Sequence, residues 1–217
     1  MKITRIPVAL EGIPFILLAG FATLIVALLE MEAVALAGLA ATTFVLYFFR
    51  DPSRLIPEDE SALVSPADGR IILVEQVTDD RYLNAYVQKV SIFMNVFDVH
   101  VNRVPFAGTV EKIVYSPGRF YSADSIRAGL ENETCAIILD AGPGRRLAFV
   151  QMAGLIARRI VCWAEKGDSL AKGSRFGLIR FGSRVDLYLP PELRLEVKKG
   201  QRVKAGETII GRFLPLP

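Results

Sequence analysis

Two long apolar runs stand at the beginning of the chain. Residues 13–29 and 33–49 contain no charged side chain, and Glu30 and Glu32 lie between them. Each run has 17 residues, which makes a helix about 25 Å long, near the lower limit for crossing a hydrocarbon core about 30 Å thick. Neither run shows the polar stripe of an amphipathic helix. The pattern predicts a membrane-associated helical hairpin over residues 1–50, which either spans the bilayer or embeds in one leaflet.

Two other interpretations of the runs fit less well. Paired core helices of a soluble protein would show polar outer faces, and a signal peptide would show a single run followed by a cleavage site. Lys2 and Arg5 precede the hairpin, and Arg50 and Arg54 follow it. Because basic residues favour the cytoplasmic side, we expect both ends of the hairpin there. The rest of the chain is then a domain held at the cytoplasmic face of the cell membrane.

After the hairpin the pattern changes to short strands separated by turns. A turn cluster at 65–69 precedes a strand-like run at 71–77, and residues 87–104 are rich in β-branched and aromatic residues, which predicts a long, partly buried strand region. Eight further strand-like runs follow, near 109–114, 135–139, 147–152, 159–164, 176–181, 184–189, 193–197 and 208–213. No helix longer than three turns is expected in this part of the chain, except around residues 122–130. The pattern predicts an α+β, mostly β fold, with a compact, barrel-sandwich-like catalytic domain over residues 51–217.

Charge is unevenly distributed along the chain. Residues 1–141 carry 11 basic and 17 acidic residues, whereas residues 142–217 carry 15 basic and 6 acidic ones. Such asymmetry fits either ordinary solvated surface or a basic face for an anionic partner. Together with the hydrophobic hairpin, it favours an anionic membrane lipid surface as that partner, and no nucleic acid.

Cysteine and histidine are scarce. Cys135 and Cys162 have neither metal-like nor redox-like spacing, so two buried free thiols in a reducing compartment are favoured over a disulfide. The chain has one histidine, His100. Multi-histidine metal sites are therefore excluded, and no carboxylate motif for a metal is visible.

The dipeptide Gly182-Ser183 lies between two strand-like runs. On its own, Gly-Ser is a common turn. Held tightly, however, the Ser183 hydroxyl can add to the Gly182 carbonyl, shift the chain to an ester and break it by elimination. The resulting dehydroalanine loses ammonia and leaves a ketone. That ketone can form a Schiff base with a substrate amine and accept electrons as CO₂ leaves.

Five blocks of the sequence resemble, in the same order, the short, membrane-associated phosphatidylserine decarboxylase family. They are FFRDP (48–52), SPADG (65–69), MNVFDVHVNRVP (94–105), KGSRFGLIRFGSRVDLYLP (172–190) and VKKGQRVKAGETIIG (197–211). The resemblance implies self-cleavage between Gly182 and Ser183 into chains 1–182 and 183–217, which remain together as a heterodimer. It also implies a covalent pyruvoyl cofactor derived from Ser183, with conversion of phosphatidylserine to phosphatidylethanolamine in phospholipid biosynthesis.

The same resemblance places His100 and Asp68 in the active site. His100 would protonate the carbanion left by decarboxylation, because an imidazole changes charge near pH 6.5. Asp68 matches the aspartate of the family's Pro-x-Asp-Gly block, although a turn aspartate also commonly bonds its own backbone. Longer family members have a second histidine where this chain has Arg103. Either His100 also assists self-cleavage, or Asp68 acts more directly.

Three arginines are candidates for binding the lipid phosphate or carboxylate: Arg103, Arg180 and Arg184. A planar guanidinium pairs bidentately with either group, and all three lie near the blocks that carry the chemistry. The sequence also permits Arg103 to pair with Asp68, holding the carboxylate ionised and oriented.

Two rival functions stay open at the level of sequence. A serine hydrolase could use Ser183, His100 and Asp68, but the chain lacks a G-x-S-x-G elbow and an oxyanion loop. A membrane-tethered binding module is the second rival, since stretches 64–71 and 197–208 resemble turns of lipoyl- and biotinyl-carrier folds. No lysine there has the sequence context that a carrier requires, so this likeness concerns the fold.

Overall fold

The chain divides into two units, Met1–Ser53 and Arg54–Pro217. The computed structural model describes four stretches of it: 7–125, 127–155, 159–180 and 182–214.

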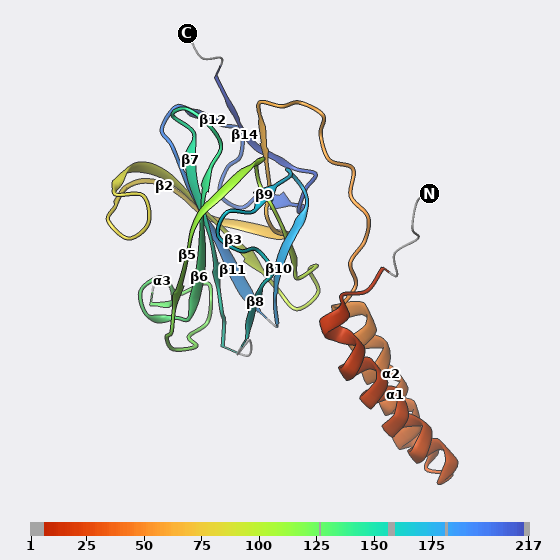
Figure 1. Cartoon of the computed structure of the whole chain (residues 1–217). Coiled ribbons are helices and arrows are strands. Elements are labelled where there is room, and N and C mark those ends of the chain that lie inside the picture. The colour runs from red at the N-terminus through yellow and green to blue at the C-terminus, as the bar shows by residue number, and fades with distance from the viewer. Residues whose placement is uncertain (1–6, 126, 156–158, 181, 215–217) are drawn as a thin grey trace. The chain divides into compact units, whose positions relative to one another are not determined.

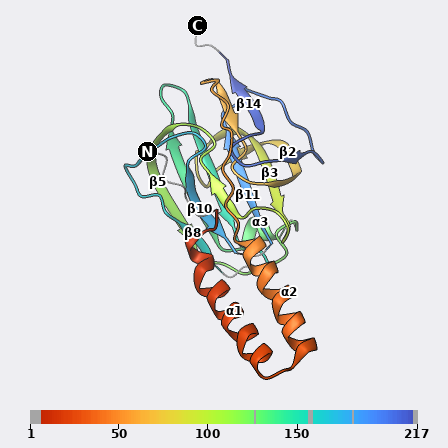
Figure 2. The same ribbon diagram turned by 90° about the vertical axis from the view of Figure 1, so that its right-hand side faces the viewer.

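The first unit is a helical hairpin (Figures 1 and 2). A turn of 3-10 helix, η1 (Leu10–Gly12), leads into α1 (Ile13–Leu28), where a proline in the first turn suits the helix start. A tight turn with Glu30 at a φ of 56° connects α1 to α2 (Glu32–Phe48). The two helices match the predicted apolar runs to within a residue at each end.

The two helices of the hairpin pack closely around a pair of threonines. Thr23 Oγ1 and Thr42 Oγ1 lie 3.1 Å apart, and a Cβ at Gly38 would lie 2.8 Å from Thr23 Oγ1. Small and hydroxyl residues at such a contact are typical of helices that associate in lipid. Within the described residues, Leu10–Leu28 is long and apolar enough to cross a membrane, and Glu32–Phe48 is shorter.

The second unit is built from short antiparallel strands and one short helix. Its elements are β1 (Ala62–Val64), β2 (Gly69–Asp79), β3 (Ala85–Met94), β4 (Val101–Arg103), β5 (Gly108–Ser116), α3 (Ala128–Glu131), β6 (Thr134–Asp140), β7 (Arg146–Met152), β8 (Ile160–Cys162), β9 (Ser169–Leu170), β10 (Arg175–Ile179), β11 (Ser183–Leu189), β12 (Leu193–Leu195), β13 (Arg202–Val203) and β14 (Ile209–Phe213). Eight strands form a sheet in the order β13-β2-β3-β11-β7-β6-β5-β9, which curls into a half-barrel (Figure 1). Two three-stranded sheets, β1-β14-β12 and β4-β10-β8, complete the unit.

The central strands of the large sheet are buried on both faces. Successive side chains of a strand point to opposite faces, and Leu187 lies in the main core with Phe149 while Tyr188 lies in a second cluster with Tyr82. The Tyr82 and Tyr188 rings meet edge to face, with centroids 5.1 Å apart. Each fully buried large apolar side chain stabilises the fold by about 1.5–3 kcal/mol. The packed sheet therefore holds the residues at its strand ends in fixed positions.

The structure confirms the α+β, mostly β fold with its N-terminal hydrophobic hairpin. Most predicted strand-like runs coincide with strands, but the sequence pattern missed three very short ones, β1, β9 and β13. Both cysteines are free thiols, as favoured above, with Cys135 buried and Cys162 half-buried.

One local prediction was wrong. The run at 87–104 is not one continuous strand region, because β3 ends at Met94 and a loop precedes β4. Side-chain oxygens cause that break: Asp98 Oδ2 accepts the Asn95 N–H at 2.9 Å, and Asn95 Oδ1 accepts the Phe97 N–H at 2.8 Å. Such bonds compete with strand pairing. As expected, the described residues of the second unit contain no helix longer than three turns; α3 overlaps the end of the 122–130 stretch, of which residue 126 lies outside the described residues.

Candidate active site

One end of the large sheet gathers the termini of four strands. β11 begins at Ser183, which pairs with Met94 at the end of β3, and Arg184 pairs with Met152 at the end of β7. On the other side of β3, β2 begins at Gly69. The loops that adjoin these strand ends therefore lie at the same end of the sheet as the Gly182-Ser183 bond.

Ser183 is fully buried, and its hydroxyl has no hydrogen-bond partner among the described residues. Leaving a buried hydroxyl unsatisfied costs about 1–3 kcal/mol, so such a group calls for a functional explanation. The residue before it, Gly182, has a φ of 53°, in the left-handed region that glycine alone adopts easily. The nucleophilic oxygen and the peptide bond that it could attack thus lie together in an unusual backbone conformation.

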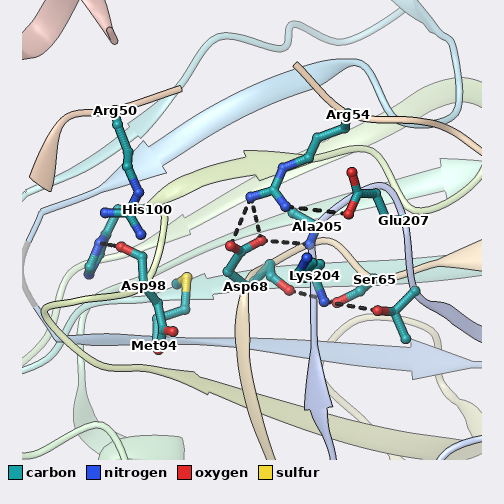
Figure 3. Close-up of polar contacts among 12 residues, drawn as sticks. Arg50, Arg54, Ser65, Asp68, Met94, Asp98, His100, Lys204, Ala205 and Glu207 are labelled. Carbon is teal, nitrogen blue, oxygen red and sulfur yellow. Dashed lines mark hydrogen bonds and ion pairs between the residues drawn. The ribbon is translucent and has the colours of Figure 1, made fainter. Parts of the chain in front are cut away.

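Asp68 lies in the turn before β2, held by three hydrogen bonds from two donors (Figure 3). Arg54 Nη2 donates to both carboxylate oxygens, at 2.9 and 2.8 Å, and the Ala205 N–H donates to Oδ1 at 2.7 Å. The side chains of Arg54 and Asp68 are 7% and 14% exposed, so this ion pair is shielded from water. Glu207 lies 3.6 Å from Arg54 Nη1 and completes the cluster.

The suggested pairing of Arg103 with Asp68 is wrong. Arg103 Nη1 instead donates to the Gly173 carbonyl at 2.9 Å, and Arg54 takes the place beside Asp68. The sequence analysis used Arg54 only as a basic residue flanking the hairpin. Its position close to the FFRDP block was the signal that could have assigned it to the site.

Asp68 is close to the sheet end that carries Ser183. A Cβ at Gly69 would lie 2.1 Å from the Phe93 carbonyl oxygen, so the start of β2 is pressed against the end of β3. The next residue of β3, Met94, is the partner of Ser183. Asp68 therefore precedes a strand that is separated from β11 by β3 alone.

His100 is fully buried, and its ring orientation is fixed. Nδ1 lies 3.0 Å from the Asp98 carbonyl oxygen (Figure 3). A carbonyl can only accept, so Nδ1 carries the proton and Nε2 is the nitrogen that gains or loses one. The His100 carbonyl accepts the Ile179 N–H at 3.3 Å. This bond ties His100 to the last residue of β10, four residues before Ser183.

The three candidate arginines have different environments. Arg184 is paired bidentately with Asp186, with both N···O distances 2.6 Å, and its Nη1 lies 3.3 Å from the Ala123 carbonyl. Arg103 is buried against Gly173, as described above. Arg180 is half-buried beside the cleavage site. Arg184 is thus committed to a structural ion pair, and this geometry gives no support for a direct contact with a lipid headgroup.

A buried polar chain behind the site was missed by the sequence analysis. Gln151 Nε2 donates to Asn102 Oδ1 at 2.9 Å, and Asn102 Nδ2 lies 3.6 Å from Met94 Sδ. The chain connects β7, β4 and β3 and ends at the residue opposite Ser183. Its sequence signal was weak, consisting of isolated amides inside strand-like runs.

Metal ligation has no visible basis in the part of the chain that the structure describes. There, no group of three or more His, Cys, Asp or Glu side chains is arranged to hold a metal ion.

Comparison with known proteins gives a consistent result. Residues 41–211 match a family model described as phosphatidylserine decarboxylase. Three relatives, each named phosphatidylserine decarboxylase proenzyme, are similar over nearly their full lengths. The protein of Desulfotalea psychrophila is 56% identical over 210 residues, covering 97% of this chain and 98% of the relative. The protein of Pelobacter propionicus is 50% identical (98% and 100% covered), and that of Syntrophus aciditrophicus is 49% identical (95% and 97% covered).

Proposed function

Since the chain belongs to the phosphatidylserine decarboxylase family, we propose that Ser183 is the residue from which its catalytic group is made. The enzyme is a carboxy-lyase that converts phosphatidylserine to phosphatidylethanolamine, and it is produced as a proenzyme. The observation that carries the proposal concerns Ser183 and the residue before it. The buried Ser183 hydroxyl lacks a partner among the described residues, and Gly182 has a φ of 53°.

The proposed self-cleavage uses groups of the chain itself. Ser183 Oγ bonds to the Gly182 carbonyl carbon, the C–N bond breaks, and an ester and a free amine result. Elimination across Ser183 then releases Gly182 as a carboxylate and leaves dehydroalanine. Its imine tautomer takes up water and loses ammonia, which leaves a ketone. Asp68, held in place by Arg54 and Ala205, is the proposed base for the first step.

A pyruvoyl group fits this position. The serine from which it would be made is already buried, and strand β11 holds the residues that follow it in register with β3 and β7. Such a group supplies a ketone that holds the substrate amine and accepts electrons as CO₂ leaves. Nδ1 of His100 is held by the Asp98 carbonyl. We therefore assign Nε2 of His100 as the atom that donates or accepts a proton during turnover. General acid–base groups of this kind contribute about 10²–10⁴-fold to rate.

The two products of cleavage are proposed to stay together as a heterodimer. The small product, residues 183–217, would contain β11 to β14, and these strands pair with β1, β2, β3 and β7 of the large product. Among these strands, β11 pairs with β3 over its full length, from Ser183 to Leu189. Separating the chains would expose this buried strand, which is strongly unfavourable.

Substrate access is proposed to depend on the membrane. None of the 16 residues of α1, all of them described, is buried, so its apolar surface suits a lipid environment better than water. We assign the hairpin, residues 1–50, to anchoring at the cytoplasmic face of the cell membrane. The basic C-terminal part adds attraction to anionic lipid, and Arg180 and Arg103 are the proposed headgroup contacts.

A carbonyl reagent tests the proposed function. The purified enzyme is incubated with phosphatidylserine vesicles, and CO₂ release is measured with and without prior treatment with phenylhydrazine. We expect the reagent to abolish turnover, because it would react with the ketone derived from Ser183. Turnover that survives complete treatment would contradict a pyruvoyl mechanism.

A further inference from the structure

A second glycine lies against the bond that is proposed to break. Beyond the end of β7, Gly154 is buried, and a Cβ built on it would lie 1.8 Å from the Gly182 carbonyl oxygen and 2.9 Å from the carbonyl carbon. Because a Cα–Cβ bond is about 1.5 Å long, that oxygen is within about 3.3 Å of Gly154 Cα. This is the range of a weak Cα–H···O contact.

The backbone that carries Gly154 is held firmly in this place. The Ala153 N–H donates to the Glu133 carbonyl at 3.0 Å. The Ala153 carbonyl accepts from Asn132 Nδ2 at 2.7 Å, and Asn132 is buried. Residue 154 therefore cannot easily move away from a larger side chain.

Gly154 and Gly182 are glycines for different physical reasons. Gly182 has a φ of 53°, but among the described residues, its own chain neighbours aside, no atom lies within 4 Å of the position of its missing Cβ. Gly154 lies outside the left-handed region, yet its missing Cβ would overlap the Gly182 carbonyl oxygen. At residue 182 the requirement is backbone conformation, and at residue 154 it is space.

We propose that Gly154 is a positioning residue for self-cleavage, which leaves the space that the Gly182 carbonyl occupies when Ser183 attacks it. As Ser183 Oγ bonds to the carbonyl carbon, the π electrons move to the carbonyl oxygen and that oxygen leaves the peptide plane. Its position beside Gly154 Cα sets the face of the carbonyl presented to the hydroxyl. This inference rests on the proposed cleavage site and concerns its first step alone.

Gly154→Ala is the direct test. A misplacement of about 1 Å at a reacting centre can reduce a rate by about 10²-fold, so we expect the variant to remain full-length while the wild type is cut. Hydroxylamine, which cuts an ester and spares an amide, should find no ester in the variant. Any molecules that are cut should turn over at the wild-type rate per cleaved chain, because residue 154 acts before the catalytic group exists.

Gly144→Ala is the matched control, since residue 144 has a φ of 69° in a turn where no described residue beyond its chain neighbours has an atom within 4 Å of its Cβ position. It should be cut at the wild-type rate despite some backbone strain. The structural cost at residue 154 is measured separately, by comparing the thermal unfolding of Ser183→Ala with that of Gly154→Ala/Ser183→Ala, neither of which can cleave.

Three results would overturn the proposal. They are wild-type cleavage of Gly154→Ala, an ester that hydroxylamine detects in it, and failure of the double variant to fold. The last result would assign the space at residue 154 to folding. A wild-type chain that is not cut at Gly182-Ser183 would instead refute the proposed function, so the two failures are distinguishable.

Discussion

The hairpin and the β unit place apolar and polar side chains in opposite ways. Apart from Thr23, the side chains of α1 are apolar and none is buried, whereas all seven residues of β11 are buried, including Arg184 and Asp186. An apolar surface turned outward is stable in lipid, and an ionised pair turned inward is tolerated only when each charge has its partner. The two regions are therefore built for different solvents.

Polar groups differ between the regions in the same sense. In the hairpin, the Thr23 and Thr42 hydroxyls lie beside the carbonyls of Ala19 and Gly38 in their own helices and beside each other, which gives both hydroxyls partners without water. In the β unit, the Ser183 hydroxyl is buried without a partner among the described residues. The hairpin exposes few polar groups, whereas the sheet end buries the hydroxyl that is proposed to attack Gly182. That difference fits the proposed roles of the hairpin as an anchor and of the sheet end as a catalytic site.

The largest expected effect comes from removing that reactive group. Ser183→Ala should remain a single full-length chain and show no decarboxylase activity, because it has no hydroxyl to attack Gly182. Denaturing gels and CO₂ release measure the two properties. Ser174→Ala, which removes a hydroxyl from a turn where it bonds the Ala171 carbonyl, is the control and should be cut and active. A cleaved Ser183→Ala protein would show that another group starts the reaction.

His100 and Asp68 are expected to divide the chemistry between them. His100→Ala should still yield two chains but lose turnover by about 10²–10⁴-fold, as is typical of general acid–base groups. Asp68→Asn should accumulate uncut precursor. The cleaved fraction and the turnover per cleaved chain are measured separately for each variant.

If His100→Ala also accumulates precursor, His100 serves both steps, and cleavage of the wild type should slow as the pH falls and the imidazole becomes protonated. A His100→Ala protein that is fully cut and fully active would remove His100 from the mechanism.

The contrast between the regions also explains what the sequence could predict. The hairpin follows from composition alone, because helices in lipid satisfy their own backbone and need only apolar residues. Strands such as β6 and β7 follow from local patterns in the same way. The site does not follow from local patterns, because its contacts join residues that are separated in the sequence. Arg54 and Asp68 are 14 residues apart, and Gly154 and Gly182 are 28 residues apart. Contacts of this kind depend on strand register, which local sequence specifies poorly.

Removing the hairpin tests whether anchoring and chemistry are separable. A chain lacking residues 1–49 should leave the membrane pellet at high salt and still cut itself, because the strands around Ser183 come from the second unit. Partial retention that salt removes would assign the remainder to exposed charge, which is screened within about 10 Å at 0.1 M salt. Full retention at high salt would contradict the assignment of the hairpin as the main anchor.

The smallest expected effect concerns the threonine pair of the hairpin. Thr23→Val and Thr42→Val should show a coupling of about 0.6 kcal/mol in a double-mutant cycle, the average for such contacts in membranes. Opening of the hairpin is followed by energy transfer between dyes on the two helices as sodium dodecyl sulfate is added. Thr43→Val is the control, because Thr43 bonds the Leu39 carbonyl of its own helix. Equal effects for all three variants would argue against an interhelical bond.

The intact mass of the mature protein tests the central claim most directly. We expect two polypeptides, residues 1–182 and a fragment beginning at position 183 that resists Edman sequencing. The mass of the small fragment should be one ammonia lower than that of a hydrolytic fragment with an N-terminal serine. A fully active protein that consists of the uncut chain, or whose small fragment begins with an ordinary serine, would contradict the account.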